Sequence, residues 1–235
     1  MRNVCGFPVF FVAAIAVVQP LGAQSGNRTG SFIRDKIPAE IPIARGTLSE
    51  PLARQVSYDF GLCVVQTYHK RVNEIAGFTL KPAQVNDVMK RLANDDCLMG
   101  GTLTIPEMLM RGAIFRGLYL RDFAKAQPEL QAMPVDYEPI SGGTDMLTAE
   151  GYATYMNFAD CVVRAEPAGA RALTMAKPAT PKETEAIAQL SPKLGQCMPA
   201  GNTVKLNRAS LAALVSEALY RQAKAAVPPV AGSRK

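Results

Sequence analysis

The chain has 235 residues, a net charge of +6, one histidine, five cysteines and no tryptophan. Its apolar and charged fractions are ordinary for a globular protein, and its basic residues are scattered rather than clustered with aromatic residues. This composition argues against a nucleic-acid-binding surface, and we expect no nucleic-acid partner. The scattered basic residues are interpreted as solvated charge, and this includes Arg111, Arg116 and Arg121.

Residues 1–23 have the pattern of a secretory signal peptide. Arg2 precedes an apolar run from Phe7 to Val18, and Ala23 offers a cleavage point. The run is shorter than the roughly 20 residues that a membrane span needs, so we expect no span in the mature chain; an uncleaved anchor is the alternative. Residues 24–48 mix Ser, Gly, Asn and Arg with Pro-Ile pairs, and they are predicted to form an extended or disordered lead-in.

The first half of the mature chain is predicted to be helical. Apolar residues at positions i, i+3, i+4 and i+7 indicate a long helix from Glu50 to about Lys70. A short helix near 72–76 and a third helix over 81–93 follow. Residues 103–105 alternate apolar and polar side chains, which is typical of a short extended segment, and a last helix begins at Pro106.

The second half repeats this pattern. The first three helices recur 98 positions later, and the last helix recurs 101 positions later. The third helix of this half, over 181–190, has the clearest start signal, because Thr180 and Glu183 form a capping box around Pro181. Residues 204–206 match the extended segment of the first half, and the two segments are candidates for pairing with each other.

The fold class is therefore predicted to be mainly α, with two tandem, pseudo-equivalent helical units. The units span 50–125 and 148–225, a Pro- and Gly-containing linker covers 126–147, and a flexible tail covers 226–235. Each unit is small for a single hydrophobic core, so we expect disulfides and mutual packing to stabilise both.

Removal of the signal peptide also removes Cys5. Four cysteines then remain: Cys63, Cys97, Cys161 and Cys197. An even number in an oxidising compartment indicates two disulfides. A unit that existed alone before duplication had to pair its cysteines within itself. We therefore predict Cys63–Cys97 and Cys161–Cys197, each closing one unit, with cross-pairing between the units as the alternative.

Small residues recur on the last helix of each unit. Gly112 and Gly117 align with Ala213 and Ala218. Glycine inside a helix costs about 1 kcal/mol relative to alanine, so its use here indicates close packing of helices. The alternative is that a ligand approaches at these positions, which makes these four residues the candidate ligand-facing residues.

No catalytic or metal-binding constellation stands out in the sequence. His69 lies beside two basic residues, has no counterpart in the second half and is interpreted as a surface residue. The cysteines lack C-x-x-C spacing and are expected to be oxidised, which removes the thiolates that metals or nucleophilic attack require. Nucleotide-binding and hydrolase motifs do not occur. We therefore assign no catalytic, cofactor-binding or metal-binding residue and expect no cofactor.

Most of the chain resembles a known group of proteins. Cys161-Val162-Val163, Cys197 and the segment 217–221, with weaker counterparts in the first half, resemble uncharacterised secreted, duplicated, cysteine-paired helical proteins of sphingomonad-type bacteria. The resemblance covers residues 50–225. It implies a protein of the bacterial envelope, periplasmic or secreted, and it implies no activity.

Three functions remain as hypotheses. The first is a non-catalytic periplasmic or secreted protein with a structural or partner-binding role, because the repeated positions are core and cysteine residues rather than polar ones. The second is a carrier for a small apolar ligand, with a cavity between the units near the four small residues. The third is a hydrolase of envelope polymers that uses two carboxylates, at least one with a raised pKa. The expected partner is thus an envelope protein or an apolar small molecule.

Overall fold

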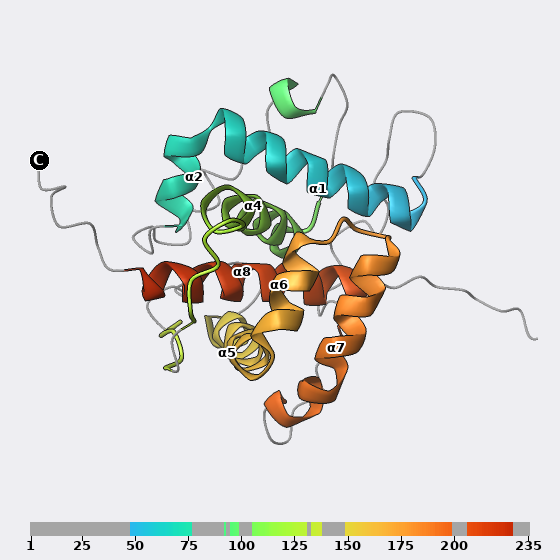
Figure 1. Cartoon of the computed structure of the whole chain (residues 1–235). Helices are drawn as coiled ribbons and strands as arrows, with labels where there is room; N and C mark the ends of the chain where they lie inside the picture. The colour runs from blue at the N-terminus through green and yellow to red at the C-terminus, as the bar shows by residue number, and fades with distance from the viewer. Residues whose placement is uncertain are drawn as a thin grey trace, which may run out of the picture.

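The computed structural model describes residues 48–76, 92, 95–98, 105–130, 133–137, 149–198 and 206–227. Within these residues the chain is helical and contains no strand (Figure 1). Several predicted segments lie outside the described residues: the signal peptide 1–23, nearly all of the lead-in 24–48 and of the helix 81–93, most of the extended segments 103–105 and 204–206, and most of the tail 226–235.

Each half of the chain contributes four helical segments to the described residues. The first half contributes α1 (Glu50–Thr67), α2 (His69–Ala76), the short 3-10 helix η1 (Asp95–Cys97) and α4 (Glu107–Asp122). The second half contributes α5 (Ala149–Ala165), α6 (Pro167–Met175), α7 (Pro181–Cys197) and α8 (Arg208–Ala226). The predicted fold class, mainly α with two tandem units, is confirmed.

Both predicted disulfides are confirmed. Cys63 on α1 is bonded to Cys97 on η1, and Cys161 on α5 is bonded to Cys197 at the end of α7. Disulfides of this kind persist in oxidising compartments, so they indicate an extracytoplasmic location. None of the helices in the described part of the chain is long and apolar enough to cross a membrane.

Helix α7 is longer than predicted. The sequence places its end at Leu190, but the helix continues through Pro192 to Cys197. Proline inside a helix removes a backbone hydrogen bond, so this extension needs support from elsewhere. Leu194 packs against the core, and Cys197 forms a disulfide with Cys161 of α5. These two interactions keep the last turns of α7 helical.

Helix α8 lies at the centre of the molecule. Figure 1 shows α1, α4, α8 and α5 following one another across the fold, and the contact between α4 and α8 is the most extensive of all. Every residue from Ser210 to Ala223 is buried. A helix buried on all sides must satisfy its polar side chains inside the protein, and this requirement creates the polar clusters described below.

The small residues of α4 lie at the points where helices approach most closely. A Cβ atom added to Gly112 would lie 2.2 Å from the Cβ of Ala213, so two residues that the sequence aligns face each other at the crossing of α4 and α8. A Cβ added to Gly117 would lie 2.9 Å from Val65 on α1. Glycine therefore permits backbone approaches that any larger residue would prevent.

Candidate functional site between the two units

A small cavity lies where α1, α4, α8 and the turn before α7 meet. Its volume is about 60 Å³. It lies between the two units, as the carrier hypothesis expects. Of the four candidate ligand-facing residues, Gly112 and Ala213 line it, whereas Gly117 packs on α1 and Ala218 is buried in the core. Its polar and charged wall comes from four helices: Arg54, Ser57 and Tyr58 of α1, Arg116 of α4, Glu183 of α7 and Ser216 of α8.

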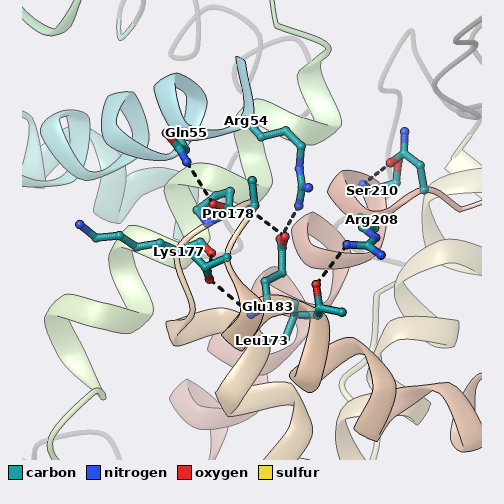
Figure 2. Close-up of polar contacts among 12 residues, drawn as sticks. Arg54, Gln55, Leu173, Lys177, Pro178, Glu183, Arg208 and Ser210 are labelled. Atoms are coloured by element: carbon teal, nitrogen blue, oxygen red, sulfur yellow. Dashed lines mark hydrogen bonds and ion pairs between the residues drawn. The ribbon is translucent and has the colours of Figure 1, made fainter. Parts of the chain in front are cut away.

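An ion pair between Arg54 and Glu183 closes one side of this cavity. Glu183 is fully buried, and its carboxylate accepts a hydrogen bond from the Arg54 guanidinium, as Figure 2 shows. The sequence predicts that the Glu183 carboxylate also caps the N–H of Thr180. The carboxylate accepts instead from the N–H of Ala179, at 2.9 Å, while the Thr180 hydroxyl accepts from the N–H of Glu183, at 3.5 Å.

The turn before α7 is strained at this point. Ala179 has φ of 58°, a left-handed conformation that is uncommon for residues other than glycine. The turn is fixed from α1 as well, because Gln55 donates a hydrogen bond to the carbonyl oxygen of Pro178 at 3.5 Å (Figure 2). Contacts from α1 and α7 thus hold the backbone conformation that shapes the cavity wall.

Arg116 is a buried cation that uses backbone carbonyls as acceptors. Only 5% of its surface is exposed, and it donates to the carbonyl oxygens of Thr174 at 2.7 Å and Leu173 at 3.1 Å, in the last turn of α6. Its guanidinium carbon lies 4.6 Å from the centre of the Tyr58 ring. Burial lowers the pKa of Arg116 to about 10, although Tyr58 and Glu183 act in the opposite direction. The side chain therefore stays charged at neutral pH.

A second polar cluster lies at the contact of α4, α5 and α8. One carboxylate oxygen of Glu217, which is 3% exposed, accepts hydrogen bonds from Arg111 at 2.6 Å, Arg221 at 2.8 Å and Tyr152 at 2.6 Å. Arg111 also donates to the Tyr152 hydroxyl at 2.9 Å. The ring of Phe115 lies under both guanidinium groups, with its centre 4.6 Å from the Arg221 carbon.

The protonation states of this cluster are fixed by its charges. Burial would raise the pKa of Glu217, but the charges of Arg111 and Arg221 lower it to about 2. Burial raises the pKa of Tyr152 to about 12. Glu217 is therefore a carboxylate and Tyr152 a neutral phenol at every physiological pH, and neither is poised to exchange protons with a substrate.

Asp160 forms a third cluster, which holds the linker against the helices. It is fully buried, and it accepts hydrogen bonds from Gln222 at 2.7 Å, Arg164 at 2.7 Å and Tyr137 at 3.2 Å. Tyr137 belongs to the linker, whereas the other two donors lie on α8 and α5. This carboxylate therefore fixes the path of the chain between the units.

The interpretation of the basic residues as solvated charge is wrong for two of them. Arg111 and Arg116 are 6% and 5% exposed. The signal was available in the sequence: apolar residues are spread around all sides of the helix from Met108 to Leu118, which leaves no wide polar face for solvent. His69 is exposed, as predicted.

The described residues contain no cluster of metal-binding side chains. Within the described ranges, no group of three or more histidine, cysteine or acidic side chains is arranged to hold a metal ion.

No protein-family model, curated protein or solved structure is similar enough to this chain to place it in a family.

Proposed function

We propose that this chain is a non-catalytic protein of the bacterial periplasm or exterior, and that it acts by binding an envelope protein. The observation that carries the proposal is the division of polar groups in the described part of the chain. Three buried carboxylates are each paired with an arginine, two of them across the units, and the larger open spaces lie at the surface.

The buried carboxylates favour a structural role. Glu183, Glu217 and Asp160 are each paired with an arginine, and the first two pairs join different units. A glycosidase-type hydrolase needs a carboxylic acid that keeps its proton near neutral pH. Because the pKa of Glu217 is about 2, this carboxylate cannot serve as that acid, and the cluster does not support the hydrolase hypothesis.

The cavity between the units gives little support to an apolar-ligand carrier. Pockets for small organic ligands usually measure about 300–1,000 Å³ and are largely apolar. This cavity measures about 60 Å³, and two arginines and a glutamate contribute to its wall. Its size and charge suit a water molecule or a small ion rather than an apolar molecule.

A hollow at the surface has the chemistry of a protein-binding site. About 400 Å³ in volume, it lies where α2 and the end of α4 meet the end of α8. Phe123 and Tyr220 lie at its base, 7% and 2% exposed, and Tyr220 donates a hydrogen bond to Asp122 at 3.1 Å. Exposed Arg121 and Lys224 add positive charge at its rim. Arginine is enriched at protein interfaces. A further hollow, of about 640 Å³, lies beside α5 and α6.

The compartment and the origin of the fold are part of the proposal. The signal-like segment 1–23, the resemblance to secreted sphingomonad-type proteins and the two disulfides support export from the cytoplasm. The shared order of helices and the intra-unit disulfides support a duplication of one ancestral unit.

Site-specific photo-crosslinking in the exporting bacterium tests the partner-binding proposal. A photoreactive residue is placed at one of two positions. Lys224 lines the surface hollow, whereas Met133 lies outside it and is 71% exposed. We expect a discrete heavier adduct from position 224 and none from position 133. Identical adduct patterns at both positions, or no adduct at either, would contradict the proposal. Native mass spectrometry of the exported protein provides the counter-test, because a retained apolar molecule would favour the carrier instead.

A further inference from the structure

We propose that the cavity between α1, α4, α8 and the turn before α7 binds a compact monovalent anion, of the size of a halide or formate, between the guanidinium groups of Arg54 and Arg116. This site is separate from the surface hollow, and its existence does not depend on the partner-binding proposal.

The charges around the cavity do not balance. Three side chains of the described residues that line it are charged at neutral pH: the cations Arg54 and Arg116 and the anion Glu183. Glu183 accepts its ion-pair hydrogen bond from Arg54 alone. One positive charge is therefore left in excess, and a buried charge is costly unless an opposite charge or several hydrogen bonds compensate it.

The carbonyl groups at the end of α6 compensate Arg116 only in part. They occupy its Nε and Nη2 atoms, and no bond from Nη1 is found within the described part of the chain. Nη1 is not fully buried, so a small ion in the cavity can reach it. Arg54 likewise bonds Glu183 through Nη2, and its side chain is 11% exposed.

The two guanidinium groups repel each other across the cavity. Burial is the main reason that the pKa of Arg116 is lowered, and the charge of Arg54 acts in the same direction. An anion between them would reverse this contribution. The arginines of the other cluster differ, because Arg111 and Arg221 both donate to the same oxygen of Glu217.

The size and lining of the cavity select the kind of anion. About 60 Å³ accommodates a compact ion but not a larger organic ligand, and the small residues Gly112, Ala212 and Ala213 form an apolar wall beside the arginines. One excess positive charge matches a monovalent ion. Exposed Lys177 and Arg208 are drawn on either side of Glu183 in Figure 2, and their charges add positive potential to this region.

Thermal unfolding in matched salts tests the site. Sodium bromide is compared at equal ionic strength with sodium gluconate, a monovalent anion too large for the cavity. The bromide-minus-gluconate difference in Tm is measured in the whole mature chain and in three variants. Arg116→Gln removes a guanidinium, and Ala209→Met fills the cavity from α8 with the side chain that the other half carries at the aligned Met108. Arg121→Gln removes the same charge from α4 outside the cavity.

With bromide at about five times its dissociation constant, we expect the bromide-minus-gluconate difference in Tm to depend on the cavity. It should be about 2–4 °C larger in the unmodified chain and in Arg121→Gln than in Arg116→Gln and Ala209→Met. Comparing variants cancels the general effects of the salts. If Arg116→Gln does not fold, Ala209→Met decides the outcome. The same difference in all proteins would overturn the proposal, as would crystals grown in bromide without an anomalous peak beside Arg116.

Discussion

The two places where the first helix of a unit meets the central pair α4 and α8 are built alike but filled differently. Alignment of the two halves places Arg54 opposite Tyr152 and Arg116 opposite Glu217. The contact of α5 with α8 is filled by the Arg111, Glu217 and Tyr152 cluster, whereas the contact of α1 with α4 leaves the small cavity.

Three aligned positions explain this difference. On the side of the filled cluster, α4 carries Met108, Arg111 and Phe115. At the aligned positions of α8, which face the cavity, the residues are smaller: Ala209, Ala212 and Ser216. The same crossing of helices can therefore hold either a closed ionic cluster or a space, depending on the volume of a few side chains.

The largest expected effect comes from breaking the filled cluster. Glu217→Gln removes the carboxylate that two buried arginines share, and loss of one partner from a buried ion pair costs about 3–5 kcal/mol. Glu183→Gln should cost about 1–3 kcal/mol, because Arg54 is partly accessible and the glutamine oxygen can still accept from Ala179. Urea unfolding of both variants measures the difference. Equal losses would show that the two clusters are not energetically distinct.

Acid should reduce the contribution of the same cluster. The pKa of Glu217 is about 2 in the folded protein, against an ordinary value of 4.5. A lowered pKa stabilises the fold above pH 4.5, and this stabilisation is lost as the pH falls toward 2. The difference in unfolding free energy between the unmodified chain and Glu217→Gln should therefore shrink by about 3 kcal/mol as the pH falls from 5 to 2. Denaturation curves that stay parallel across this range would contradict the assignment.

A smaller effect separates close helix packing from ordinary helix propensity. Gly112→Ala places a Cβ 2.2 Å from the Cβ of Ala213, and forced repacking of this kind usually costs about 1–3 kcal/mol. Gly195→Ala on α7 meets nothing within 4 Å and should stabilise the protein by up to about 1 kcal/mol. Thermal unfolding compares the two variants. A stabilising Gly112→Ala would mean that α4 and α8 do not approach as closely as described.

The sequence determined the helices and the disulfides because both depend on local or repeated patterns. Apolar spacing marked α1 and α4, and Pro181 marked the start of α7. The repeated pattern of the two halves predicted the pairing of Cys161 with Cys197. The end of α7 was missed, because contacts made by Leu194 with distant residues, rather than local propensity, hold its last turns.

Only the tertiary structure decided where the charges lie. The sequence contains Arg111, Arg116, Glu183 and Glu217 as separate residues, and nothing in their spacing relates Arg111 to Glu217, 106 positions away. The Arg111–Glu217 pair forms because α8 is surrounded by other helices, so its buried polar side chains must find partners on those helices. The cavity has the same origin, because its volume depends on which side chains face one another after packing.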